Sequence, residues 1–199
     1  MLLREFDHEY KPIDANSPEF KAWFGKSVVK NPDGTPMKVY HGTSAEKDFS
    51  SFLAKSKAYF FTPNPKYAYK IATGGILPDI HHYHHRIIPV YLSLQNPFDA
   101  RKYNKITEED FFELFKFIGW YGPHLFPFWS LFLEHTKGVR DFLLKHGYDG
   151  LIQFEKWTPE STERNKIAYV VFHPWQIKSA ISNTGKFSKD NSDITEGKQ

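Results

Sequence analysis

A histidine next to a glycine stands where a predicted strand ends, and these two residue types can form a binding site together. His41 follows the apolar stretch Val39-Tyr40 and precedes Gly42. Near neutral pH an imidazole can donate or accept a hydrogen bond. A glycine has no Cβ, so its backbone can come close to a flat ligand. The pair is typical of a site, although a single histidine at a strand end also serves as an ordinary hydrogen-bonded surface or core residue.

Two further apolar stretches carry residues that could serve the same site. Tyr59-Phe60-Phe61-Thr62 comes next along the chain, and Ala168-Tyr169-Val170-Val171-Phe172 lies near its end. Aromatic side chains can stack on a flat ring as well as pack in a core. Aromatic residues make up 18% of the sequence, so composition alone leaves both uses open.

Local signals predict the elements that lead to His41. Ser17-Pro18 supplies an N-cap and a first helical residue, and Gly25 supplies a stop, which together predict a short helix. A hairpin then spans residues 28–40 around a turn that contains Pro, Asp and Gly. The hairpin places His41 just beyond its second strand.

The middle of the chain predicts one more helix and a strongly β-forming strand. Asn64-Pro65 provides the cap and first residue of a helix that runs to Gly74-Gly75. Residues 87–94 form the β-forming run, which is predicted to be a central strand. Pro89 lies within this run and favours an edge position or a bulge instead.

The second half of the chain mixes helices and strands without a regular order. This lack of alternation favours an α+β fold with mainly antiparallel strands over a doubly wound sheet. Helices are predicted at residues 107–117 and 129–145, and strands at 151–154, 167–172 and 176–181.

The chain has the length and composition of one folded domain. Its 199 residues are 40% hydrophobic, which is enough to bury a core. Residues 1–16 show no period and are predicted to be an N-terminal arm. Residues 17–183 form the predicted domain, and residues 184–199 have so little apolar content that a flexible polar tail is predicted.

Charge and composition exclude several classes of function. The net charge of +3 is too small to imply a nucleic-acid partner by itself. The chain has no cysteine, so disulfides, thiolate metal sites and cysteine nucleophiles are excluded. The N-terminus does not resemble a Sec-type signal peptide, and charges and prolines interrupt the apolar region 111–133. The sequence predicts a soluble protein without a membrane span, in an undetermined compartment and oligomeric state.

Taken in order, these motifs resemble the ADP-ribosyltransferase (ART) superfamily. The similar stretches are Tyr40-His41-Gly42-Thr43, Tyr59-Phe60-Phe61-Thr62 and 169–179, within a match that spans residues 17–179. The resemblance is greatest to the ART domains of phage and mobile-element polyvalent proteins, in the diphtheria-toxin and poly(ADP-ribose) polymerase branch. It implies a split pair of mainly antiparallel β-sheets with flanking helices around a central NAD cleft.

The resemblance also implies a co-substrate and a reaction. NAD would be cleaved at the nicotinamide bond through an oxocarbenium-like ribose cation, without a metal. His41 would hydrogen-bond a ribose hydroxyl, and the backbone of Gly42 would hold the nicotinamide amide. Thr43 would contact the ribose on the adenine side.

The second motif supplies aromatic residues to the same implied site. Tyr59 and Phe60 belong to this motif, and Phe60 matches its aromatic position, where the family usually has a tyrosine. Phe60 would sandwich the nicotinamide ring with Tyr69 or Tyr67 from the helix that follows. Core packing is the alternative for each of these rings.

The third motif departs from the family. Its strand usually begins with a glutamate that bonds the ribose 2′-hydroxyl and steadies the cation, and this chain has Ala168 there. Three outcomes are open: a transferase of single ADP-ribose units with a carboxylate lent by its substrate, an acid supplied by the preceding loop, or a silent NAD-binding module. Glu163 is the candidate acid in that loop, which also holds Glu155 and Glu160, although a solvated loop charge is the plainer interpretation.

A histidine cluster at residues 81, 82, 84 and 85 invites a metal hypothesis, because imidazoles bind zinc and nickel. Adjacent histidines on a loop seldom converge on one ion, and no acidic or cysteine partner follows at ligand spacing. No metal site is therefore predicted. A surface whose partner binding depends on pH is the alternative for His81, His82, His84 and His85.

Two classes of function follow from the sequence. The first is an NAD-dependent mono-ADP-ribosyltransferase that modifies a macromolecule, in the first place a protein, with NAD hydrolysis as a side reaction. The second is a catalytically weak or silent module on the same fold. It would either keep a pocket for NAD or ADP-ribose, or bind a protein through the aromatic run 120–129. A nucleic-acid modifier of the same superfamily is a third reading, against which the small net charge argues. Three origins stay open: a bacterial effector, a phage protein and part of a larger polypeptide.

Overall fold

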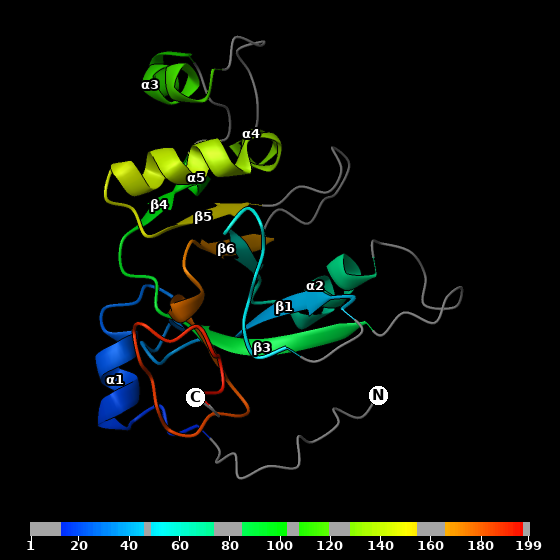
Figure 1. Ribbon diagram of the computed structural model, residues 1–199, viewed down its shortest axis with the longest axis vertical. Coiled ribbons are helices and arrows are strands. Elements are labelled where there is room, and N and C mark those ends of the chain that lie inside the picture. The colour runs from blue at the N-terminus through cyan, green and yellow to red at the C-terminus, as the bar shows by residue number, and fades with distance from the viewer. Residues whose placement is uncertain are drawn as a thin grey trace.

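The computed structural model describes residues 13–45, 49–73, 85–102, 108–119, 128–154 and 166–196. This part of the chain forms two β-sheets and five α-helices, with short 3₁₀ turns at Ala100–Lys102 and Pro174–Gln176 (Figure 1). Both sheets are wholly or mostly antiparallel. The predicted α+β fold class is confirmed.

The first sheet contains His41 and has the strand order β1-β3-β7. Its strands are β1 (Val39–Thr43), β3 (Arg86–Leu92) and β7 (Ile177–Ser179). The central position predicted for the strand that contains Pro89 is confirmed. The Pro89 carbonyl oxygen accepts a hydrogen bond from the backbone N–H of Ala180 at 3.0 Å, just past the end of β7.

The second sheet lies beside the first and has the strand order β2-β6-β5-β4. Its strands were each predicted from the sequence except for the edge strand β4, which pairs parallel with β5. A proline begins this three-residue strand, and no alternation marks it in the sequence. The strands are β2 (Tyr59–Phe61), β4 (Pro97–Asp99), β5 (Gly150–Phe154) and β6 (Ile167–Val171).

The helices cover the sheets in separate groups. Figure 1 shows α4 and α5 over the second sheet, α3 beyond them, and α2 beside β1. Helix α1 lies at the opposite end, next to the C-terminal segment. The bounds are α1 (Pro18–Phe24), α2 (Pro65–Ala72), α3 (Glu108–Ile118), α4 (Phe128–Glu134) and α5 (Thr136–Lys145).

Three clusters of buried side chains hold these layers together. The first lies between helices α3–α5 and one face of the second sheet, and includes Leu114, Phe132, Leu143 and Val170. The second joins the two sheets, with Val39, Val90, Phe61 and Tyr169 among its members. The third surrounds α1 and includes Phe20, Trp23 and Phe187. Adjacent residues Tyr169 and Val170 of β6 therefore serve opposite faces, as strand geometry requires.

The predicted helix caps are confirmed. Ser17 Oγ accepts a hydrogen bond from the N–H of Phe20 at 3.1 Å at the start of α1. Asn64 Oδ1 accepts from the N–H groups of Lys66 and Tyr67 at 3.0 and 3.2 Å at the start of α2. Such caps satisfy N–H groups that the helix itself leaves without partners.

Among the boundaries that differ from the sequence prediction, two change the account of the fold. The strand expected to end at Tyr40 continues to Thr43, because β3 supplies pairing partners as far as Arg86. His41 and Gly42 therefore lie inside the strand. The single helix expected at 129–145 is instead two helices, α4 and α5, which meet at His135.

The prediction of a flexible tail at residues 184–199 is wrong for its described part. Phe187 packs in the cluster around α1, and Ile194 packs in the cluster between the sheets. The backbone also pairs with the domain, because the Ser179 N–H donates to the Ile194 carbonyl at 2.8 Å. A few apolar residues are enough to hold a polar segment in place when each of them packs in a core that other elements form. Residues 1–12 of the predicted arm lie outside the described residues.

None of the helices in the described part of the chain combines the length and the apolar character needed to cross a bilayer.

Candidate functional site

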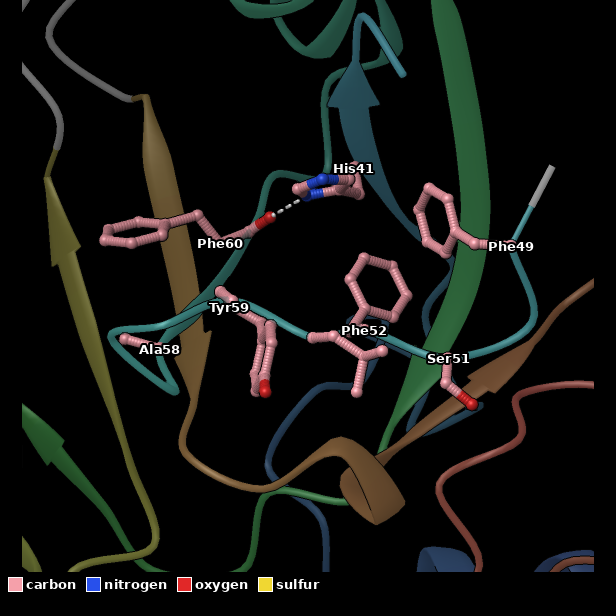
Figure 2. A pocket seen from close by; sticks show the side chains of 9 residues that line it. His41, Phe49, Ser51, Phe52, Ala58, Tyr59 and Phe60 are labelled. Carbon is pink, nitrogen blue, oxygen red and sulfur yellow. Dashed lines mark hydrogen bonds between the residues drawn. The ribbon is translucent and has the colours of Figure 1, made fainter. Parts of the chain in front are cut away.

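A hydrogen bond between the two sheets fixes the His41 imidazole. Its Nδ1 lies 2.9 Å from the backbone oxygen of Phe60 on β2 (Figure 2). A carbonyl oxygen can only accept, so Nδ1 carries the proton in this bond. In the neutral ring, Nε2 is then left as an acceptor. The site therefore offers a ligand hydroxyl one oriented acceptor.

The surroundings of His41 keep the ring neutral. Burial lowers the pKa of His41 below its ordinary value of 6.5, and the hydrogen bond to Phe60 opposes part of that shift. The Phe52 ring meets the imidazole edge-on, at 5.0 Å between centroids, and the Phe61 ring is tilted at 5.6 Å. His41 is thus held as a neutral acceptor at neutral pH.

A mostly aromatic cavity opens beside His41. Figure 2 shows the Phe52 ring next to the imidazole, with Phe49 on one side of Phe52 and Tyr59 on the other. The cavity measures about 360 Å³, which is a common size for part of a small-molecule site. Its lining comes from β1, β2 and the segment between them: His41, Phe49, Ser51, Phe52, Leu53, Ala54, Ala58, Tyr59 and Phe60.

Gly42 is required by the packing of helix α2. A Cβ at this position would lie 1.8 Å from the backbone oxygen of Ala68, which no side chain can tolerate. The sequence predicted that a ligand could approach the backbone of Gly42 closely. In the structure, helix α2 makes such a close approach. Any role of its backbone toward a ligand is separate from this packing.

The open edge of β1 presents the polar groups of Gly42. Tyr40 and Thr62 exchange two backbone hydrogen bonds, at 2.8 and 3.0 Å, on the side of β1 that faces away from β3. Backbone groups in a strand point to alternate sides, so Gly42 directs its N–H and C=O to the same side as Tyr40. In the described part of the chain, nothing pairs with this edge beyond Tyr40. The next residue, Thr43, accepts a hydrogen bond from the N–H of Ala45 at 3.2 Å through Oγ1.

The two residues of the second motif face different ways. Tyr59 is 4% exposed and lines the aromatic cavity. The Phe60 ring points away from His41 in Figure 2 and lies 5.7 Å from the Phe132 ring of α4. Only the Phe60 backbone therefore contacts His41, a role that the sequence did not suggest.

The two candidate tyrosines lie on α2. Tyr67 is 3% exposed, with Lys166 Nζ at 4.6 Å from its ring centroid. Tyr69 is half-buried, and its ring centroid lies 6.3 Å from that of His85. Among the described residues neither tyrosine is in ring contact with Phe60, so the proposed nicotinamide sandwich stays a prediction.

The position of the missing acid lies in the middle of the second sheet. Ala168 on β6 is 1% exposed and pairs with Gln153 on β5. Gln153 is 2% exposed, and sequence reasoning did not single it out. The polar residue inside the apolar stretch 150–154 was a signal, but its position opposite Ala168 required the strand register. Glu155, Glu160 and Glu163 lie outside the described residues.

The described residues contain no group of three or more histidine, aspartate or glutamate side chains that could hold a metal ion. Of the predicted histidine cluster only His85 is described, and His81, His82 and His84 lie outside the described residues.

Two mostly antiparallel sheets with flanking helices, bridged by His41 and the Phe60 carbonyl, are consistent with a domain of the ADP-ribosyltransferase superfamily. More narrowly, the family model of the ADP-ribosyltransferase in polyvalent proteins matches residues 31–187, and the chain belongs to this family. Neither a curated protein nor a solved structure matches the chain.

Proposed function

We propose that this domain transfers single ADP-ribose units from NAD to a macromolecular acceptor, in the first place a protein, and releases nicotinamide. Family membership supports a transferase of the ADP-ribosyl type. The observation that carries the proposal for NAD is the His41 ring, which is half-buried, neutral and oriented by the Phe60 carbonyl.

His41 and Gly42 would together position NAD. His41 Nε2 accepts a hydrogen bond from a ribose hydroxyl, because Nδ1 is already engaged. The N–H and C=O of Gly42, on the open edge of β1, match the acceptor and donor of the nicotinamide carboxamide. The aromatic cavity next to His41 accommodates the adenine half, with Thr43 at the adjoining ribose.

The reaction needs positioning more than covalent help. The bond between the ribose C1′ and nicotinamide breaks, and its electron pair leaves with nicotinamide. The acceptor nucleophile bonds to C1′ and loses its proton to water. The ribose passes through a cation-like transition state, as in glycoside hydrolysis, so rate depends on charge complementarity. Water in place of the acceptor gives NAD hydrolysis as a side reaction.

The missing acid predicts a slow enzyme. Ala168 brings no charge to the position where the family usually has a glutamate. Removing one preorganised electrostatic group costs about a hundredfold to a thousandfold in rate. An acid lent by the acceptor, or Glu163 from the preceding loop, would recover part of this loss.

A second candidate function is a module that binds NAD or ADP-ribose without turning it over. Ala168 favours this candidate, because binding groups are present in β1 while the third motif carries no acid. The two candidates share the NAD site and differ only in turnover.

The test compares two histidines that make the same kind of bond. His146, at the end of α5, also has Nδ1 near a backbone oxygen, that of Phe142, at 2.8 Å. Protein is incubated with labelled NAD and a cell lysate, and release of nicotinamide and labelling of macromolecules are measured. His41→Ala is expected to lower both at least tenfold, and His146→Ala is expected to leave them unchanged.

Each outcome separates the candidates. Labelled protein that depends on His41 supports the transferase, and label in nuclease-sensitive material would replace protein with nucleic acid as acceptor. NAD binding that depends on His41, without turnover, favours the binding module. Absence of both binding and turnover refutes the proposed function.

A further inference from the structure

The side chain of Gln153 is buried with an unsatisfied acceptor. Gln153 lies on β5 with 2% of its surface exposed. Its Oε1 has no hydrogen-bond partner among the described residues. Buried side-chain oxygens nearly always have a partner, and leaving one without a partner costs stability. An exception of this kind points to a ligand that supplies the missing donor.

The strand register places Gln153 on the face of the second sheet that carries Phe60. Gln153 pairs with Ala168, while Leu151 and Phe60 both pair with Val170, two residues further along β6. Side chains two residues apart share a face, so Gln153, Ala168 and Phe60 lie on one face. Continued by one residue, the β2–β6 register sets Thr62 opposite Ala168, and Thr62 is bonded to Tyr40 next to His41.

Gln153 can reach the position of the missing acid. Glutamine has the length and shape of glutamate, and directly paired residues of neighbouring strands have Cβ atoms about 5 Å apart. Oε1 of Gln153 therefore lies within side-chain reach of the position where a carboxylate on residue 168 would act.

We propose that Gln153 supplies from β5 the acceptor that the family places on β6, and that its Oε1 accepts a hydrogen bond from the 2′-hydroxyl of the nicotinamide ribose of NAD. This inference rests on the proposed function, because it needs NAD in the site. The amide carries no charge, so it orients the ribose and contributes little to stabilising the cation. NAD binding is retained in this arrangement while turnover is slow.

Packing alone is the competing explanation for a glutamine at position 153, since a large residue on β5 could pack beside the small Ala168. Two substitutions separate the explanations. Gln153→Met keeps the length and volume and removes the acceptor. Gln153→Glu keeps the acceptor and adds the charge. Thermal unfolding of each variant reports the packing role independently of NAD.

The experiment measures the dissociation constants of the full chain for NAD and for its analogue that lacks the 2′-hydroxyl on the nicotinamide ribose, by calorimetry. Wild type is expected to bind NAD about fivefold more tightly than the analogue, which is the size of one neutral hydrogen bond. Gln153→Met is expected to bind both equally. Gln153→Glu is expected to hydrolyse NAD at least tenfold faster than wild type.

The outcomes distinguish this inference from the proposed function. If His41→Ala weakens NAD binding while Gln153→Met still prefers NAD over the analogue as strongly as wild type does, the inference about Gln153 fails and the NAD site stands. If wild type binds no NAD, both fail. Should Gln153→Glu not fold, the comparison of wild type with Gln153→Met still decides.

Discussion

Lys178 and Glu196 form a buried ion pair that fastens the C-terminal segment to the sheet that carries His41. Lys178 Nζ lies 2.5 Å from Glu196 Oε1, and the two side chains are 0% and 1% exposed. The other donors of the ammonium group reach the backbone oxygens of Asn191 and Asp193 at 2.9 and 3.2 Å. Glu196 in turn accepts from the N–H and Oγ of Ser188 at 2.6 and 3.0 Å. Every donor of the buried ammonium group is satisfied.

Breaking this pair should destabilise the whole domain. Glu196→Ala leaves the buried Lys178 charge without its partner, which costs about 3 kcal/mol or more. Urea unfolding followed by fluorescence measures the loss. Glu113→Ala is the control. This glutamate is 82% exposed, and its contact with His146 Nε2 is long, at 3.8 Å. Its loss is expected to change the unfolding free energy by less than about 0.5 kcal/mol. An unchanged unfolding midpoint in Glu196→Ala would show that the segment is not part of the fold.

Gly42→Ala should also lower stability, because the new Cβ meets the Ala68 carbonyl of α2. Backbone atoms cannot rotate away, so α2 must shift, at about 3 kcal/mol. Gly138→Ala in α5 is the matched control. Its Cβ would lie 2.8 Å from the side chain of Ile118, and alanine favours the helix by about 1 kcal/mol. Equal unfolding free energies for the two variants would argue against close packing of α2 on β1.

The pH dependence of NAD binding follows from the lowered pKa of His41. Binding needs the neutral ring, which persists below pH 6.5 because burial disfavours the charged form. The dissociation constant is expected to stay constant from pH 8 to pH 7 and to rise with a midpoint below the ordinary value of 6.5. Calorimetry across this range measures it. A rise already between pH 8 and pH 7 would contradict a half-buried, neutral His41.

The contribution of His41 to folding stability also decreases as pH falls. Its folded-state pKa lies below the unfolded value of 6.5, so the unfolded chain takes up the proton first as pH falls. The contribution is complete above pH 6.5 and is lost as pH drops below it. His41→Gln should remove this part of the acid sensitivity, which unfolding curves at several pH values would show.

Restoring the acid should raise turnover. Ala168→Glu puts a carboxylate on β6 where the family usually has one, and nicotinamide release is expected to rise about a hundredfold. Ala168→Gln is the control, because it adds the same volume without the charge. Both variants are best made together with Gln153→Ala, since Gln153 pairs with residue 168 and both positions are buried. Equal rates for the two double variants would show that charge at this position does not limit the reaction.

The sequence by itself determined the elements that depend on near neighbours. Ser17 and Asn64 cap their helices through bonds that span two or three residues, so the helix starts could be predicted. The irregular order of helices and strands was enough for the α+β class, and the order of the motifs was enough for the family. The absence of an acid at Ala168 was visible at once.

Only the tertiary structure decided what joins residues that are far apart in the chain. The proton position on His41 depends on the Phe60 carbonyl in the other sheet, and the need for Gly42 depends on Ala68 in α2. Gln153 meets Ala168 only through the β5–β6 register, and the polar C-terminal segment is ordered by a pair between Lys178 and Glu196. These relationships rest on pairing and burial between separate elements, and no local pattern records which elements will meet.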